Sequence, residues 1–111
     1  MPGAGRTIDD VMPKSTLVVK IDKSLRLGKN IHDAAAGNWI LNLSKAQSIN
    51  TLVAVANKQV VGVFDTLHAY ALPSGIDAGR VRFTIKELPH SQWSPYVKMA
   101  PFTFNAACKY I

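Results

Sequence analysis

The pattern of apolar residues is most distinctive from position 51 to position 67, where the chain reads TLVAVANKQVVGVFDTL. Two apolar runs meet at Asn57 and Lys58, which predicts a β-hairpin with a two-residue turn. The predicted register pairs Val55 with Val60, Val53 with Gly62 and Thr51 with Phe64. A hairpin that faces water on one side alternates polar and apolar residues, whereas this one is apolar on both faces. The hairpin is therefore expected to be the covered centre of a sheet or small barrel.

Alternating residues on both sides of the hairpin predict further strands. The residues expected to face the core are Leu17, Val19 and Ile21 in the stretch 16–22, and Val81, Phe83 and Ile85 in the stretch 80–88. The second strand of the hairpin is expected to extend through Tyr70 toward Leu72, and residues 106–111 are expected to close the sheet. Gly62, in the middle of a strand, indicates a bend or bulge.

A short helix is predicted over residues 30–37, with Asn30 as its N-cap and Asp33 as a shortened capping-box acid. Gly37 would end this helix. The alternative is a helix that continues through Gly37, because Ile31, Ala35, Trp39 and Leu43 follow four-residue spacing. Glycine costs about 1 kcal/mol inside a helix, which favours the break. A further helical turn capped by Ser44 is expected at 45–48.

These elements predict an α+β fold: a mostly antiparallel, five- to six-stranded twisted sheet or pseudobarrel with one or two short helices. The hairpin face with Leu52, Ala54 and Ala56 is small enough for the helix to lie close, and the other face would line the barrel interior. Residues 1–13 contain two prolines and two glycines and are expected to form a flexible N-terminal arm. Residues 14–111 would form a single domain.

Thirteen lysines and arginines against seven acidic residues give the chain a net charge of +6, which favours an anionic partner. The single cysteine, Cys108, forms no internal disulfide, and its apolar neighbours predict a buried thiol. No apolar run approaches the ~18 residues of a membrane span, so the expected location is cytoplasmic, with no membrane partner.

No pattern typical of catalysis or metal binding is present in the sequence. His32, His68 and His90 are far apart and have no neighbours at metal-ligand spacing. Neither a nucleophile elbow nor a glycine-rich phosphate loop is found. The sequence therefore predicts a protein that is not an enzyme and has no cofactor and no metal.

A row of cations is the clearest charged constellation. Arg80, Arg82 and Lys86 fall on one face of a predicted strand, where alternate residues stand roughly 6.6 Å apart and could follow a phosphate backbone. The alternative is a solvated edge face, where basic side chains discourage pairing with another sheet. A predicted basic loop, 23–29, adds Arg26 and Lys29 as candidate phosphate ligands.

Trp39 is the main aromatic candidate, since it follows Asn38 at the expected helix end and lies near the basic loop. An aromatic ring there could form a stacking wall for a base, or it could plug the core and donate a hydrogen bond through its indole N–H. Four further aromatic residues are expected to be exposed and to support self-association: Trp93, Tyr96, Phe102 and Phe104.

The order of elements resembles a known group. NIHDAAAGNW, the hairpin LVAVANKQVVGVFD, the strand start GRVRF and the terminal AACKYI follow one another in the chain. This order resembles that of small prokaryotic and phage proteins with a PUA-like pseudobarrel, related to ASCH and EVE domains, over about residues 16–111. The resemblance implies binding of RNA, modified DNA or a nucleotide, with Trp39 as a pocket wall and Arg80 and Lys109 contacting phosphate or base.

Two positions depart from the pattern of that group. An arginine usually precedes the Trp39 position, where Asn38 stands here, and an Asn-Pro pair usually precedes the closing residues, where Ala106 and Ala107 stand. Lys109 and Tyr110 keep the pattern. The alternative that the ligand site of the group is lost or changed here therefore stays open.

Charge, the cation row and the resemblance together predict a non-enzymatic module that binds nucleic acid or a nucleotide. The candidate site residues are Arg26, Lys29, Asn38, Trp39, Arg80, Arg82, Lys86, Lys109 and Tyr110. The alternative hypothesis is a protein-interaction or small-molecule-binding accessory protein of a phage or mobile gene cassette, which self-associates through the four aromatic residues named above.

Overall fold

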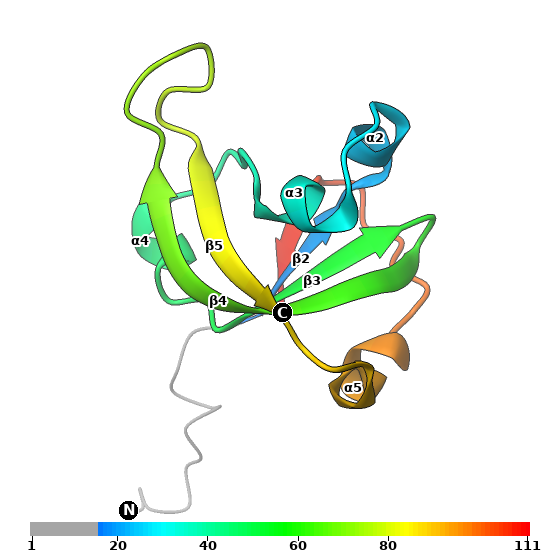
Figure 1. The fold of residues 1–111 in the computed structure, drawn as a ribbon. Coiled ribbons are helices and arrows are strands. Elements are labelled where there is room, and N and C mark those ends of the chain that lie inside the picture. The colour runs from blue at the N-terminus through cyan, green and yellow to red at the C-terminus, as the bar shows by residue number, and fades with distance from the viewer. Residues whose placement is uncertain (1–15) are drawn as a thin grey trace, which may run out of the picture.

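A computed structural model describes residues 16–111, which form a five-stranded sheet with short helices on both of its faces (Figure 1). The strands are β2 (Thr16–Lys20), β3 (Thr51–Ala56), β4 (Gln59–Ala71), β5 (Val81–Glu87) and β6 (Cys108–Tyr110). Their order is β5-β4-β3-β2-β6, and only the β2–β3 pairing is parallel. The predicted α+β class and mostly antiparallel sheet are confirmed, but the sheet is not closed into a barrel. The predicted arm, 1–13, lies outside the described residues.

The hairpin turn is formed as the sequence predicts, but the register of the hairpin changes at a bulge. Asn57 and Lys58 both have positive φ angles, as a two-residue hairpin turn requires. Val55 opposes Val60, yet Ala54 opposes Gly62, so one extra residue, Val61, interrupts the pairing. Beyond this bulge the pairs are Val53 with Val63 and Thr51 with Asp65, and the register predicted for this part is wrong.

The bulge also exchanges the two faces of β4, because side chains alternate with a period of two residues. Phe64 joins Leu52 on the face that packs under α3, and Val63 joins Val53 on the opposite face. A Cβ atom on Gly62 would lie 2.8 Å from the Phe64 ring. The glycine predicted to mark a bulge is therefore also the residue that leaves room for Phe64.

Helix α3 (Ile31–Ala36) forms as predicted. The Asn30 side chain accepts a hydrogen bond from the Asp33 N–H at 2.7 Å, and Gly37 is extended, so the alternative of a continuous helix is wrong. Helix α4 (Leu43–Ala46) begins earlier than expected, because the side chain of Asn42, rather than that of Ser44, caps it by accepting from the Lys45 N–H at 3.1 Å.

Helix α2 (Asp22–Arg26) occupies most of the stretch predicted as a basic loop, and the strand before it ends at Lys20 rather than at position 22. The Asp22 carboxylate accepts a hydrogen bond of 2.6 Å from the backbone N–H of Asn57. This bond ties α2 to the hairpin turn. The two residues are 35 positions apart in the sequence, so the local sequence pattern does not predict this contact.

Each face of the sheet has its own apolar core. Ala34, Ala35 and Ala36 of α3 are buried in a cluster with Leu52 and with Ala54, which confirms that the small side chains of this face let the helix lie close. The second cluster is centred on valines of the central strands. It is covered by residues 88–104, which include the 3₁₀ turn η1 (His90–Gln92) and α5 (Ser94–Val97), rather than by the far wall of a barrel. Figure 1 shows α3 and α5 on opposite sides of the sheet.

The four aromatic residues predicted for self-association pack inward on this second face. Phe102 is buried, and Trp93, Tyr96 and Phe104 are half-buried against the valine cluster. The Trp93 indole N–H donates to the Leu88 carbonyl at 3.1 Å. The prediction that these rings are exposed is therefore wrong, because the long connection folds back under the sheet. None of the helices in residues 16–111 is long and apolar enough to cross a membrane.

Candidate ligand cleft

Four separate segments enclose a cleft of about 520 Å³ at the C-terminal end of β2. They are α2 with the loop that follows it, residues 37–41 after α3, the end of the loop between β4 and β5, and residues 106–110. The charged, polar, aromatic and thiol side chains of the lining are Lys20, Lys23, Ser24, Lys29, Asn38, Trp39, Asp77, Arg80, Cys108 and Tyr110. A cleft of this volume is in the range that small ligands occupy.

Trp39 is held in place by its backbone and by its indole ring. The backbone N–H of Trp39 donates to the Val81 carbonyl at 2.8 Å, and the backbone carbonyl of Trp39 accepts from the Val81 N–H at 2.8 Å. These two bonds form an isolated β-bridge at the edge of β5. The indole Nε1 donates to the Ala35 carbonyl at 2.9 Å. The ring is half-buried against the core beneath α3 and also lines the cleft. It is therefore both a core plug and a cleft wall, so the two interpretations of this residue are compatible.

Among residues 16–111, the lining has four cations and one carboxylate, that of Asp77; the cations are Lys20, Lys23, Lys29 and Arg80. Lys23 and Lys29 are exposed. Lys20, at the end of β2, donates from Nζ to the Phe104 carbonyl at 2.6 Å. A concave site lined mainly by one sign of charge concentrates ions of the opposite sign. The cleft is therefore suited to an anionic ligand.

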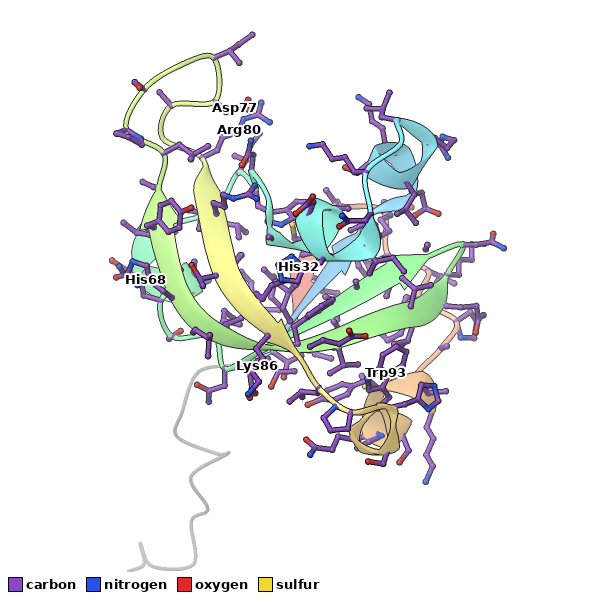
Figure 2. The ribbon with its side chains drawn as sticks, in the orientation of Figure 1. His32, His68, Asp77, Arg80, Lys86 and Trp93 are labelled. Atoms are coloured by element: carbon purple, nitrogen blue, oxygen red, sulfur yellow. The ribbon has the colours of Figure 1, made fainter. Side chains whose placement is uncertain are left out.

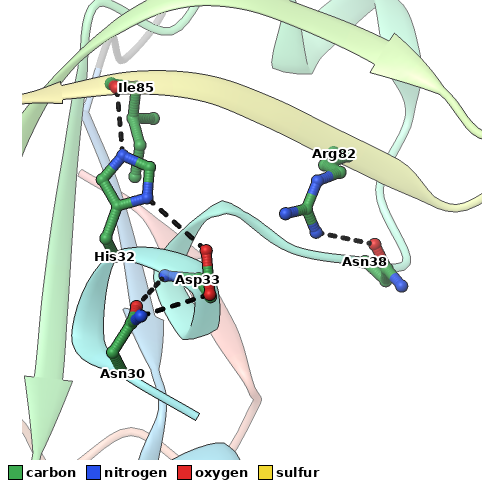
Figure 3. A network of polar contacts seen from close by, with 6 residues as sticks. All are labelled: Asn30, His32, Asp33, Asn38, Arg82 and Ile85. Atoms are coloured by element: carbon green, nitrogen blue, oxygen red, sulfur yellow. Dashed lines mark hydrogen bonds and ion pairs between the residues drawn. The ribbon is translucent and has the colours of Figure 1, made fainter.

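Arg80 and Asp77 form an ion pair, with 3.6 Å between Nε and Oδ1. The other carboxylate oxygen of Asp77 accepts a hydrogen bond of 2.9 Å from Asn38 Nδ2. The side-chain oxygen of Asn38 accepts in turn from Arg82 Nη1 at 3.4 Å (Figure 3). This chain of contacts fastens the end of the β4–β5 loop to the segment that carries Trp39. The cation Arg80 is thereby held at the cleft by a carboxylate whose second oxygen is itself anchored.

Cys108 and Tyr110 form the wall that β6 contributes. Burial raises the pKa of the Cys108 thiol to about 12, so the thiol stays protonated near neutral pH and is a poor nucleophile. Burial, and to a smaller extent the nearby Cys108, raises the pKa of the Tyr110 hydroxyl. This hydroxyl is buried and has no hydrogen-bond partner among residues 16–111. The Lys45 ammonium lies 5.1 Å from the centre of the Tyr110 ring.

Five of the nine predicted site residues meet at this cleft: Lys29, Asn38, Trp39, Arg80 and Tyr110. Arg26 lies on α2 but outside the lining, and Arg82 points to Asn38. Lys86 lies at the other end of β5, across from Asp65, and Lys109 lies 6.0 Å from the centre of the Phe104 ring. Figure 2 shows Asp77 and Arg80 together at one end of β5 and Lys86 at the other.

The predicted row of three cations is therefore not assembled as one surface. Arg80 precedes β5 and belongs to the cleft, whereas Arg82 is half-buried at its contact with Asn38, and Lys86 is distant from both. A Cβ atom on Gly37 would collide with the Arg82 guanidinium, which shows how closely this arginine approaches the chain after α3.

Three charged members of the lining are absent from the predicted site residues: Lys20, Lys23 and Asp77. Asp77 stands three residues before Arg80, a spacing that permits an ion pair across a turn. This spacing is the feature of the sequence that could predict a place for Asp77 beside Arg80. The meeting of Lys20 with residues 106–110 has no local signal, because it depends on the pairing of β2 with β6.

The histidines lie apart from the cleft and from one another. His32 contacts the Ile85 carbonyl at 3.3 Å and Asp33 at 3.8 Å (Figure 3), His68 stacks on Tyr70, and His90 lies beside Trp93. Within the part of the chain that the structure describes, no group of three or more histidine, cysteine or acidic side chains is arranged to hold a metal ion. Comparison of the chain with protein-family models, with curated proteins and with solved structures finds no match.

Proposed function

We propose that this protein is a non-enzymatic module that binds nucleic acid or a nucleotide in the cleft between α2, the Trp39 segment, the β4–β5 loop and β6. One observation carries the proposal: four cations and two aromatic residues, Trp39 and Tyr110, line the same cleft. Lysine and arginine bind phosphates, and aromatic rings offer surfaces on which bases stack. Nucleotides carry both groups in one molecule.

The chemistry of the cleft favours binding over catalysis. Its only thiol is protonated near neutral pH, because burial raises the pKa of Cys108 to about 12. Among residues 16–111, Asp77 supplies the only carboxylate of the lining, and this carboxylate is engaged by Asn38 and Arg80. The lining therefore offers charge, stacking and hydrogen bonds to a ligand.

The proposal includes a PUA-like ancestry for the domain. It is supported by the order of α3, Trp39 and the double-faced hairpin, and by Lys109 and Tyr110 in the last strand. The open sheet departs from a pseudobarrel. Ala106 and Ala107 line the cleft at the place where relatives would have an Asn-Pro pair, so the contacts to a ligand there would differ.

The test is a titration of labelled single-stranded RNA, single-stranded DNA and a labelled mononucleotide, followed by fluorescence anisotropy at several salt concentrations. We expect binding that weakens with salt, and we expect Arg80→Ala to lower the slope of log K against log [salt] by about 0.7–0.9, the value for one phosphate contact. Lys86→Ala is the matched control, because Lys86 carries the same charge at the far end of β5. Absence of binding at low salt, or equal effects of the two variants, would contradict the proposal.

A further inference from the structure

Three large aliphatic side chains stand exposed around the cleft. Leu27 follows the last turn of α2 and is 72% exposed, and Ile40 lies beside Trp39 and is 78% exposed. Ile76, next to Asp77 in the β4–β5 loop, is fully exposed. Figure 1 shows α2 and this loop projecting at the same end of the molecule. The cleft thus opens between two projections that each carry an apolar side chain.

Leu27 and Ile76 each stand beside a charged residue in the sequence. Arg26 precedes Leu27, and Lys29 follows two residues later. Ile40 and Lys29 both line the cleft, whereas Leu27 and Ile76 lie outside its lining. The three side chains belong to three of the segments that enclose the cleft, so an apolar surface and the cations of the lining are available to one ligand. A ligand that only fills the cleft would leave Leu27 and Ile76 in water.

We infer that this end of the molecule binds a single-stranded nucleic acid that crosses the cleft from α2 to the β4–β5 loop, which deepens and rests on the proposed function above. One nucleotide occupies the cleft, where its phosphate meets Lys29 and Arg80. The bases on either side pack against Leu27 and Ile76, and Arg26 binds a neighbouring phosphate. A leucine or isoleucine side chain that covers the face of an unstacked base removes apolar surface from water.

Because the site has both apolar and cationic side chains, it favours an anionic ligand that also exposes apolar surface. In a duplex the base faces are stacked on one another, and an aliphatic side chain reaches them only by unstacking a base step, which costs free energy. A single strand presents its bases without this cost. A mononucleotide fills the cleft without reaching the projections. A lipid surface is flat and would leave the recessed, half-buried Trp39 without a contact. The single strand is the occupant that uses all of these groups.

The experiment compares Leu27→Ser and Ile76→Ser with Leu67→Ser. Leu67 is 62% exposed on β4 and outside the cleft lining, so its replacement is the matched control for loss of an exposed aliphatic side chain. The probes are a labelled mixed-sequence 12-mer as a single strand, the same 12-mer as a duplex, a labelled mononucleotide, and phosphatidylserine vesicles. Circular dichroism melting confirms that each variant is folded.

We expect the wild-type protein to bind the single strand about tenfold more tightly than the duplex. Leu27→Ser and Ile76→Ser should each weaken single-strand binding roughly three- to tenfold, less than the loss of an aromatic platform, and leave the salt slope unchanged because no charge is removed. Leu67→Ser should bind as the wild type does, and binding of the mononucleotide should be the same for all four proteins.

Duplex binding as tight as single-strand binding would overturn the inference, and so would equal losses for Leu67→Ser and Ile76→Ser or a preference for vesicles. Mononucleotide binding that depends on Arg80, without any preference for the single strand, would overturn this inference and leave the proposed function standing. Failure of the wild-type protein to bind any of the nucleic acid probes at low salt would overturn both.

Discussion

The Tyr110 hydroxyl gives a prediction in which removing a polar group stabilises the protein. The hydroxyl is buried and has no hydrogen-bond partner among residues 16–111. A buried polar group left unpaired costs about 1–3 kcal/mol, the free energy of taking it out of water without a replacement bond. Tyr110→Phe keeps the ring, and with it the contact to the Lys45 ammonium. We therefore expect this substitution to raise the free energy of unfolding by roughly 1–2 kcal/mol.

The assay is equilibrium unfolding in urea, with thermal melting as a second measurement. For a domain of this size, 1 kcal/mol corresponds to a shift of about 4–8 °C in melting temperature. The matched control is Tyr96→Phe, because Tyr96 is half-buried on the other face of the sheet and its hydroxyl is not among the unpaired buried groups. A fall in stability for Tyr110→Phe of 0.5 kcal/mol or more, an amount above the usual effect of surface substitutions, would refute the reasoning by showing that the hydroxyl has a stabilising partner.

Three further predictions concern the cleft and the hairpin. Burial raises the folded-state pKa of Cys108 from 9.0 to about 12, so its protonated thiol contributes stability that is complete below about pH 9 and is lost as the pH rises toward 12. In Cys108→Ala the free energy of unfolding should therefore depend less on pH between pH 9 and pH 11. Urea titrations that show the same pH dependence for both proteins would disprove this. Gly62→Ala should destabilise the domain by about 1–3 kcal/mol, because the new methyl group would meet the Phe64 ring at 2.8 Å. Chemical denaturation measures this change, and an unchanged free energy of unfolding would contradict it. Asp77→Asn should raise affinity for an anionic ligand about two- to fivefold, because it removes a carboxylate from the lining and frees Arg80 from its ion pair. Weaker binding in the anisotropy titration would mean that Asp77 is needed to position Arg80.

The parts of the fold that the sequence predicted correctly have local causes. The turn follows from the two polar residues, Asn57 and Lys58, that separate two apolar runs, and asparagine tolerates the positive φ found there. The cap of α3 follows from Asn30 and its bond to Asp33. The register beyond the turn could not be predicted in the same way. It depends on a bulge at Val61, which places Phe64 under α3, and that packing involves residues far apart in sequence.

The candidate site was predicted in part for the same reason. Charge and aromatic character identified Trp39, Arg80 and Tyr110 as candidates, and the structure brings them to one cleft. The spacing of Arg80, Arg82 and Lys86 also suggested a single row, but spacing along a strand does not describe where long side chains turn. Arg82 turns to Asn38, which belongs to another segment, and the row is divided.

The pairing of β2 with β6 determines when the cleft can exist during folding. It joins Leu17 to Tyr110, two residues from opposite ends of the described chain, and it brings Cys108 and Tyr110 into the cleft. Contacts between such distant residues require the largest loss of chain entropy and tend to form late. A ligand in the cleft would therefore bind only chains that have completed this pairing, and it would stabilise the domain by holding together the two segments that meet last.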